Sequence, residues 1–558
     1  MACFPTKLSY WEALADVGQG PWARAKFPAI DIDGNTSSPK TLDMAYSWYA
    51  ECLGTHKSCN NLPTLKPGWL PTRLVDIGLP GDTQWKVMVT SEDITSSPPP
   101  PYMTLSYRWG LKPQRLTLSS TNETELRRGR PIDQLPRTFR DMIVVAHRFR
   151  IRYVWIDCLC IIQDSADDWK TEAPTMKDVY MNSACNVAAA ASDDPDGGLF
   201  RERDTSSVAP GLVDIQFASK ALDRYFVFDN EYERRYIHAG ALRTRGWVFQ
   251  ERFLAPRVLS FTESQVAWEC YRESKCEGFP HGRHSETRTK NIDNLLSTLE
   301  GDASPSKSGR MGEKTLQSWA GLVGEYSSCQ LTRPGDRLYA FAGVANFFQD
   351  FTGDTYLAGI WRDRALQQLC WRVVEPAPRP TKTKYRAPSW SWASVDVPVY
   401  MRDIRDKDTL LVDLVDVGVT PDRDGGMGDV VDGFVKVRGA VMAARYKPSP
   451  ERIGHFEITP RHGAVKPFTA RLHMDAAEIK YSQHGEFTML PFVVRGSSAN
   501  DSSRDSPYWS MDSLIVAPVG DSESVYRRVG VAMGKIYEKV GLRYVKIQQA
   551  ERAELVII

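Results

Sequence analysis

The sequence predicts an α/β domain built on a parallel sheet, followed by a mainly helical region and a C-terminal antiparallel β domain. First, strand-like and helix-like patterns alternate between residues 103 and 191. Second, helical apolar spacing dominates from about 271 to 373, and third, short β-type runs dominate after 384. Alternating strands and helices favour right-handed crossovers and parallel pairing, whereas short runs between turns are typical of antiparallel sheets.

Each element of the α/β part has its own apolar pattern. Met103–Tyr107 is expected to be a strand, Tyr153–Ile156 the next, and Cys185–Ala191 a buried strand of small residues. Two apolar stripes with helical spacing lie between these strands, and Pro136 suits the first turn of the first helix. The stripes comprise Leu135, Phe139, Met142, Ile143 and Ala146, then Trp169, Ala173, Met176, Val179, Tyr180 and Ala184.

Two proline-rich passages suggest the domain boundaries. Ser96–Pro101 and Val374–Thr383 can continue neither a helix nor a central strand. We therefore expect a lead-in region at 1–95, the α/β domain at 96–270, a mainly helical region at 271–383 and a β-rich domain at 384–558. The strand-like runs of the last part are Gly433–Gly439, Phe487–Val494, Ser513–Val519 and Tyr544–Ile547.

Composition narrows the class of protein. The 70 Lys and Arg residues balance 69 Asp and Glu residues, giving a net charge of +1, so nucleic acid is not an expected partner. No apolar run approaches the ~20 residues of a membrane-spanning helix, and the N-terminus lacks the pattern of a secretory signal. The ten cysteines are irregularly spaced, which favours reduced thiols. These features predict a cytoplasmic protein.

The first candidate binding motif follows the strand at residue 103. Ser106, Tyr107, Arg108 and Trp109 place a hydroxyl, two aromatic rings and a guanidinium before Gly110, which permits a tight turn. Tyr107 and Trp109 offer flat faces to a ligand ring, and Arg108 can bind phosphate in a bidentate manner. Alternatively, the aromatic rings pack in the core and Arg108 is a solvated strand end.

The second motif is the acidic end of the strand at 153–156. Asp157 can accept hydrogen bonds from ribose hydroxyls or cap the following turn. Cys158 and Cys160 lack the spacing of redox or zinc pairs and are expected to be buried thiols. The acidic residues further on are expected to form a solvated turn and a helix N-terminus rather than a cation site, namely Asp164, Asp167, Asp168 and Glu172.

The third motif runs from Arg245 to Arg252. If Trp247 opens a helix, Glu251 lies one turn away on the same face. A carboxylate beside an indole ring is partly desolvated, which raises its pKa and strengthens its hydrogen bonds to sugar hydroxyls. Alternatively, Glu251 forms an ion pair with Arg252 or Arg257.

The N-terminal region carries three metal-capable residues, Cys52, His56 and Cys59. Structural zinc requires four ligands, and no fourth is near them in the sequence, so no metal site is expected. The common nucleophile and phosphate-loop motifs are absent from the sequence.

Three blocks together resemble the fungal heterokaryon incompatibility (HET) domain. They are YMTLSYRWG at Tyr102–Gly110, the stretch Leu135–Tyr180 with YVWIDCLCIIQD at its centre, and RGWVFQERFLAPRVL at Arg245–Leu259. The similarity extends to LPTRLVDI at Leu70–Ile77, and to the follow-on regions LTRPGDRLYAFAGV and APSWSWASVD at Leu331–Val344 and Ala387–Asp396.

The resemblance implies a role in non-self recognition between fungal hyphae that ends in programmed cell death. HET domains are thought to be distant relatives of TIR domains, some of which cleave NAD, so the implied fold is TIR-like or flavodoxin-like. The segment Trp247–Glu251 resembles the helix that carries the catalytic glutamate of TIR domains, which implies Glu251, not Glu172, as the catalytic residue.

In this interpretation NAD is the substrate and no cofactor is required. Asp157 contacts ribose, Tyr107 and Trp109 stack on a ring, and Arg108 or Arg245 holds the pyrophosphate. TIR-like sites are often completed by a neighbouring subunit, so self-association is expected, together with an unknown protein partner. Two alternatives remain open: a non-catalytic signalling module, and an accessory enzyme of fungal secondary-metabolite biosynthesis.

Overall fold

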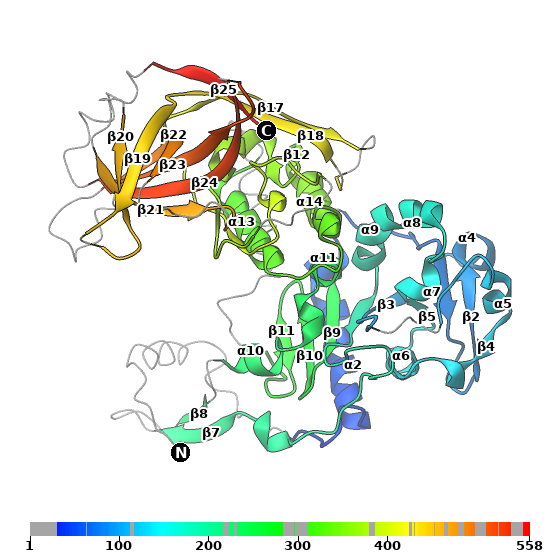
Figure 1. Cartoon of the computed structure of the whole chain (residues 1–558). Coiled ribbons are helices and arrows are strands. Elements are labelled where there is room, and N and C mark those ends of the chain that lie inside the picture. Colours follow the sequence, from blue (N-terminus) through cyan, green and yellow to red (C-terminus); the bar gives the residue numbers. More distant parts are fainter. Residues whose placement is uncertain are drawn as a thin grey trace.

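The computed structural model contains a nine-stranded mixed sheet, a helical region and a ten-stranded C-terminal sheet (Figure 1). The order of the first sheet is β11-β10-β9-β6-β3-β5-β1-β2-β4. The structure describes residues 31–62, 64–111, 116–215, 223–227, 231–282, 295, 311–378, 385–422, 427–428, 430–450, 452–461, 467–477, 485–496, 509–522, 524–536 and 551–558.

Four parallel strands form the centre of the nine-stranded sheet, in the order β9-β6-β3-β5. They are β3 (Tyr102–Ser106), β5 (Tyr153–Trp155), β6 (Cys185–Ala188) and β9 (Arg257–Phe261). The predicted strands at 103–107, 153–156 and 185–191 are confirmed as the first three of these. Because helices alternate with strands along this part of the chain, the strands are joined by crossover connections. Such connections produce the parallel pairing seen here.

The flanking strands are antiparallel, so the prediction of a parallel sheet was only partly right. One flank contains β1 (Arg73–Asp76), β2 (Gln84–Val89) and β4 (Arg130–Pro131), and the other contains β10 (Val266–Cys270) and β11 (Ser274–Cys276). Short connections join β1 to β2 and β9 to β10 to β11, and only antiparallel strands can be joined so briefly. Strands β1 and β2 come from the predicted lead-in region and complete the sheet.

Side chains of β3 alternate between the two faces of the sheet. On one face, the Tyr107 ring meets Phe139 of α6 (Arg137–Arg148) edge-on at 5.2 Å. On the other face, the Tyr102 hydroxyl donates to the Val179 carbonyl of α9 (Met176–Met181) at 2.6 Å. Helix α2 (Pro39–Thr55) packs beside α6, whereas α11 (Gly246–Leu254) packs beside α9. Thr104 and Ser106 therefore face α9 and α11.

Short helices connect these elements. They are α3 (Lys57–Asn60), α4 (Thr90–Asp93), α5 (Glu123–Arg128), α7 (Asp157–Cys160), α8 (Ala166–Glu172) and α10 (Tyr232–Tyr236). Strands β7 (Gly211–Ile215) and β8 (Asp223–Val227) form a separate hairpin between β6 and α10.

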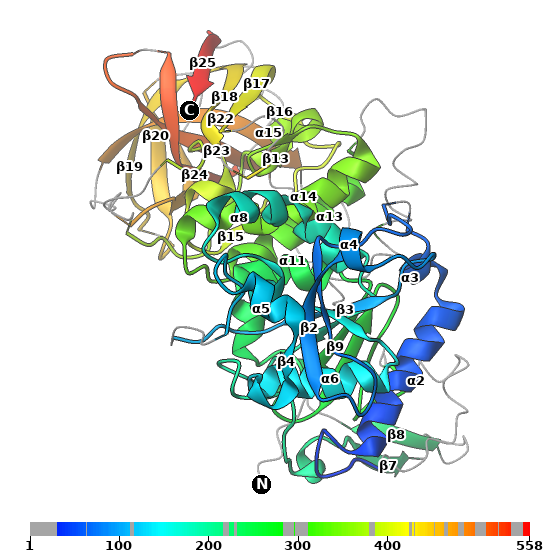
Figure 2. The same ribbon diagram turned by 90° about the vertical axis from the view of Figure 1, so that its right-hand side faces the viewer.

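The described residues between the two large sheets form helices and short strands centred on aromatic side chains. They include α13 (Glu313–Ser327), α14 (Tyr339–Thr352) and α15 (Ala365–Gln368), with the short strands β12 (Tyr356–Leu357), β13 (Ile360–Trp361), β14 (Arg372–Val373) and β15 (Val399–Tyr400). The Trp319 ring lies 5.1 Å from both Phe341 and Trp361, and α14 packs on α11. In both views this region lies between the nine-stranded sheet and the C-terminal strands (Figures 1 and 2).

Six antiparallel strands of the C-terminal part pair in a closed ring, in the order β19-β20-β21-β24-β23-β22 and back to β19. Their bounds are Met442–Pro448, Phe456–Pro460, Phe468–Met474, Val525–Ile536, Trp509–Pro518 and Gly485–Gly496. Strands β16 (Thr409–Leu410), β17 (Asp413–Pro421), β18 (Val430–Gly439) and β25 (Ala553–Ile557) extend the sheet. Among the described strands of this sheet, β24 and β25 form the one parallel pair.

Three of the four strand-like runs predicted for the C-terminal part are thus confirmed, and the strands are antiparallel as expected. Alternate residues of the ring strands are apolar and form one buried cluster that includes Ile458, Met489 and Ile515. The fourth run, Tyr544–Ile547, lies outside the described residues, as does part of the proline-rich boundary at 374–383. No helix in the described parts of the chain is long and apolar enough to cross a membrane.

Candidate active site

Side chains of the predicted motifs meet at the carboxyl edge of the parallel strands. Ser106 is the last residue of β3, and Asp157 begins α7 directly after β5. Glu251 reaches the same place from α11, which packs over that face of the sheet. In open α/β sheets, ligands bind outside this edge.

The Glu251 carboxylate is the centre of a hydrogen-bond network. The Ser106 hydroxyl donates to Oε2 of Glu251, and the Tyr180 hydroxyl also bonds to this carboxylate. Nδ2 of Asn186 donates to the Ser106 hydroxyl at 3.0 Å, while its Oδ1 accepts from Thr104 at 3.0 Å. Each of these polar groups is buried and satisfied, so the network fixes the orientation of the carboxylate.

Burial makes the Glu251 carboxyl an unusually weak acid. The pKa of Glu251 is raised to about 7, mainly by burial; the hydrogen bond from Ser106 and the charge of Arg245 lower it, and the nearby Asp157 carboxylate adds to the rise. Burial is also the main reason that the pKa of Asp157 is raised. Two carboxyl groups with perturbed pKa values at one sheet edge are characteristic of functional sites.

Asp157 is held by the first motif. Trp109 Nε1 donates to Oδ2 of Asp157 at 2.8 Å, the Cys158 backbone N–H donates to Oδ1 at 2.6 Å, and the Tyr107 side chain is a third partner. The bond to the Cys158 N–H shows that Asp157 also caps its own turn. Tyr107 is buried against Phe139, so its ring has the core position weighed as the alternative to ligand stacking.

Arg245 supplies the positive charge of the cluster. It is the residue before α11, and its Nη1 donates to the Tyr107 carbonyl at 2.8 Å. The charge of this guanidinium lowers the pKa values of both Glu251 and Asp157, so it acts on both carboxyl groups. A partly exposed cation beside two carboxylates can also bind an anionic ligand.

Two of the predicted site residues point elsewhere. Arg108 forms an ion pair with Asp193, whose side chain is exposed. Trp247 lies in the first turn of α11, as expected, but its Nε1 donates to Asp336 at 3.4 Å. One helical turn separates it from Glu251, and its ring faces the helical region instead of the sheet edge.

The alternative ion pairs proposed for Glu251 do not form. Arg252 pairs with Glu269 at 2.6 Å, and Arg257 turns toward Cys52 at the far end of its strand. Residues four positions apart share a helix face, whereas Arg252 is adjacent to Glu251 and points to another side. The partners of Glu251 are therefore hydroxyl groups.

The acidic run after Asp157 is structural but less solvated than expected. Asp168 pairs with Arg73 at 2.7 Å, and the buried Glu172 lies 3.9 Å from the same guanidinium. Asp164 accepts hydrogen bonds from the backbone and hydroxyl of Ser120, at 2.8 and 2.7 Å. Asp164 and Asp167 are both exposed, and 93% of the Asp167 side chain is accessible to solvent.

Sequence reasoning missed Asn186, Thr104 and Tyr180. Asn186 is the only amide in the predicted small-residue strand Cys185–Ala191. A buried polar side chain in an apolar strand needs a hydrogen-bond partner, so its presence was a usable signal. Tyr180 was assigned only to an apolar stripe, because a phenol packs like a core ring until its hydroxyl finds a partner.

The three metal-capable residues of the N-terminal region lie elsewhere, on the other flank of the sheet. Cys52, His56 and Cys59 gather around Cys270 of β10, and all four side chains are buried. Cys270 was not recognised as a fourth member, because 214 positions separate it from His56.

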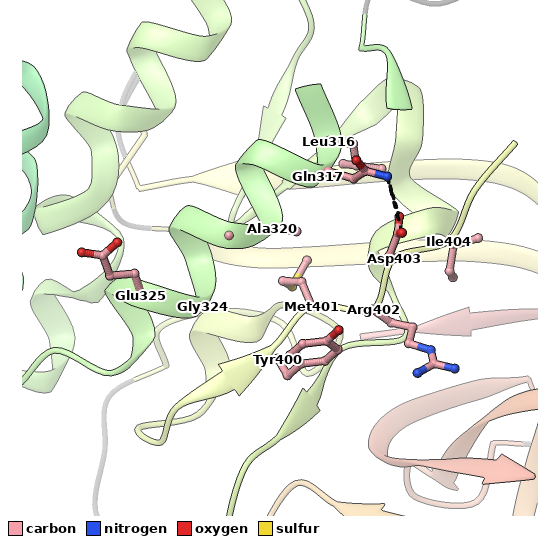
Figure 3. Close-up of a pocket in the computed structure, with 11 residues that line it drawn as sticks. Leu316, Gln317, Ala320, Gly324, Glu325, Tyr400, Met401, Arg402, Asp403 and Ile404 are labelled. Atoms are coloured by element: carbon pink, nitrogen blue, oxygen red, sulfur yellow. Dashed lines mark hydrogen bonds between the residues drawn. The ribbon is translucent and has the colours of Figure 1, made fainter. Parts of the chain in front are cut away.

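A surface cavity of about 360 Å³ lies between α13 and the segment that follows β15 (Figure 3). Gln317 faces Asp403 across its rim and donates to it at 3.3 Å. The cavity shares no residue with the cluster around Glu251.

Residues 102–251 match the family model described as heterokaryon incompatibility protein (HET). The match begins at the first residue of β3 and ends at Glu251, so it spans the elements that build the candidate site. This part of the chain is a HET domain, in agreement with the resemblance seen in the sequence. Neither the curated proteins nor the solved structures contain a match to the chain.

Replacing Ser106 by Ala is expected to raise the pKa of Glu251 above its value of about 7, because the hydroxyl stabilises the ionised carboxylate. The measurement is the pH midpoint at which folding stability changes, determined by urea unfolding across neutral pH. In a Glu251→Gln background the same substitution should leave the pH profile unchanged. A midpoint shift that persists in that background would assign the titration to another group.

The Glu251→Gln variant is expected to gain stability over the wild type as the pH rises. The pKa of Glu251 is raised from 4.5 to about 7 on folding, so its protonated form stabilises the fold below about pH 4.5, and this contribution is lost as the pH passes 7. Ionisation then costs about 3 kcal/mol, which glutamine avoids. Urea unfolding at about pH 5 and about pH 8.5 measures the difference, and an equal difference at both pH values would contradict a raised pKa.

Proposed function

We propose that the HET domain cleaves NAD between nicotinamide and ribose, in a fungal incompatibility response that ends in cell death. The observation that carries the proposal is the meeting of Glu251, Ser106, Asp157 and Arg245 at the carboxyl edge of the parallel strands. The resemblance to NAD-cleaving TIR domains suggests the substrate. The cytoplasm is the proposed location, because NAD is available there and the described cysteines are all free thiols.

The proposed reaction converts NAD and water into nicotinamide, ADP-ribose and a proton. The C–N bond breaks with its electron pair moving to the pyridinium nitrogen, which becomes neutral, so the leaving group needs no proton from the protein. The ribose C1′ gains positive charge as the bond breaks, and an ionised carboxylate close to it stabilises that charge. Water then attacks C1′ and loses a proton.

Glu251 suits the stabilising role. Its pKa of about 7 leaves a substantial ionised fraction at neutral pH, and a cationic substrate beside it favours the ionised form. The Ser106 hydroxyl holds the carboxylate in place, which lowers the cost of orienting it during the reaction.

The surrounding residues suit a nucleotide. Trp109 is only half-buried and offers a ring face, and Asp157 can accept from a ribose hydroxyl. Arg245 is partly exposed beside both carboxyl groups, and Arg108 can exchange its exposed partner Asp193 for a phosphate. These roles complete the proposed binding site without a cofactor.

The direct test is nicotinamide release from NAD by the purified full-length chain at increasing protein concentration. We expect release above the spontaneous rate, rising more steeply than protein concentration because self-association completes the site. A linear rise would contradict the self-association part of the proposal. Background-level release at every concentration, including chemically cross-linked oligomers, would contradict the proposed activity.

One observation favours a second candidate, a non-catalytic signalling module. Glu251 is only 8% exposed and already has protein partners, so its network can serve to hold α11 on the sheet. In that case Glu251→Gln should alter thermal stability and partner binding while NAD remains intact with either protein. Nicotinamide release by the wild type alone would exclude this candidate.

A further inference from the structure

Four potential metal ligands converge where the N-terminal helices meet the edge of the nine-stranded sheet. Cys52 lies in the last turn of α2, His56 links α2 to α3, Cys59 lies in α3, and Cys270 ends β10. The four donor atoms all lie within 4.8 Å of one another. Their residues are between 0 and 5% exposed, so the cluster is closed to solvent.

The separations suit tetrahedral zinc. Zinc bonds of about 2.3 Å to sulfur and about 2.0 Å to nitrogen place neighbouring ligand atoms ~3.5–3.8 Å apart. Cys270 Sγ lies 3.4 Å from Nδ1 of His56, close to that value. The three cysteines are free thiols, so no disulfide competes for these sulfur atoms.

The groups around the cluster are those that orient metal ligands. Nε2 of His56 lies 3.7 Å from Oε1 of Glu273, which leaves Nδ1 directed at the sulfur atoms. The Glu273 backbone N–H donates to Cys270 Sγ at 3.4 Å. A carboxylate behind a ligating histidine and an N–H bonded to a ligating sulfur are common second-shell contacts of zinc sites.

Charge supplies an independent argument. Arg257 is 3% exposed, and its Nε donates to Cys52 Sγ at 3.2 Å. Among the described residues no carboxylate lies within ion-pair distance of Arg257. Its other partners are neutral, namely the Ala184 and Cys59 carbonyls, the Asn60 side chain and the Tyr49 ring. A buried cation needs a counter-charge. Three thiolates around Zn²⁺ carry a net charge of −1, which Arg257 would balance.

We propose that Cys52, His56, Cys59 and Cys270 bind one structural zinc ion. Four protein ligands leave no open position for water or substrate, so the ion would have a structural role. It would fasten α2 and α3 to the end of β10, beside the first residue of β9 and at the opposite ends of the parallel strands from the cluster around Glu251. This inference is independent of the proposed NAD cleavage.

Elemental analysis of the full-length chain, purified without chelators and dialysed after incubation with Zn²⁺, tests the proposal. We expect about one zinc per chain. Cys270→Ser and Cys52→Ser should reduce bound zinc at least tenfold, to below about 0.1 per chain. Cys276→Ser is the matched control, because Cys276 is a buried thiol on the adjacent strand outside the cluster, and it should retain the ion.

Cobalt substitution of the wild type makes the test independent of whether the variants fold. Co²⁺ bound at the site should give thiolate-to-metal charge transfer and the intense visible bands of tetrahedral coordination, and Zn²⁺ should abolish both. Wild-type protein that binds no zinc and gives no such spectrum would overturn the proposal. Zinc retained equally by folded Cys270→Ser and Cys276→Ser would overturn it as well.

Discussion

The Glu251→Gln variant is expected to lose NAD cleavage by about 10²- to 10³-fold, the usual effect of removing one group that stabilises transition-state charge. Glutamine keeps the size of the side chain and can still accept from Ser106, but it cannot neutralise a developing cation at ribose C1′. The effect should fall on kcat more than on KM, because the charge develops only in the transition state. Steady-state nicotinamide release with both proteins measures it.

Glu172→Gln is the matched control for this substitution. Glu172 is also a buried glutamate of the HET domain, 3% exposed, but its carboxylate lies near Arg73 instead of the sheet edge. We expect its turnover to stay within about threefold of the wild type, as is usual for a change away from the reacting atoms. Equal losses in the two variants would show that the effect on turnover comes from general destabilisation.

Asp475→Ala is expected to destabilise the C-terminal part by about 3–5 kcal/mol, because it leaves a buried guanidinium without its carboxylate. Arg528 of β24 is 0% exposed and donates to Asp475 at 2.7 Å. Its guanidinium carbon lies 3.4 Å from the centre of the Trp371 ring, so this pair also joins the strand ring to the helical region. Urea unfolding monitored by tryptophan fluorescence measures the loss.

Two further variants separate loss of the pair from loss of a charge. In Asp475→Ala/Arg528→Met neither charge of this pair remains buried, so most of the stability should return. Glu486→Ala removes a carboxylate that pairs with Arg445 and Arg461 on the exposed surface of the strand ring, and should cost far less stability than Asp475→Ala. A double variant as unstable as Asp475→Ala would contradict the charge-burial explanation.

The sequence predicted the strands that carry the site because their local patterns are strong. Ser106 and Asp157 stand at the ends of short apolar runs, and Glu251 stands one turn into an amphipathic helix, so local rules place each at the sheet edge. The pairing of β1 with β5 was not predicted, because the hairpin of β1 and β2 has no sequence signal for the strand that it joins.

Long-range partners account for the other differences. Ser106 meets Glu251 from 145 positions away, and Cys270 meets His56 from 214 positions away. Neither spacing is a motif, since both contacts depend on how the sheet is assembled. A long-range contact also explains the wrong prediction for Trp247. Helical spacing predicts that its ring lies near Glu251, but its indole N–H donates to Asp336 of the helical region instead.

Breaking of the bond between nicotinamide and ribose is the activity that we propose for the cluster around Glu251. Its most direct test is the simultaneous quantification of nicotinamide and ADP-ribose formed from NAD by the full-length chain, with folded Glu251→Gln protein as the blank. Equimolar products are expected with the wild type, and background levels with the variant. NAD that remains intact with oligomeric wild-type protein, or products formed equally by both proteins, would contradict it.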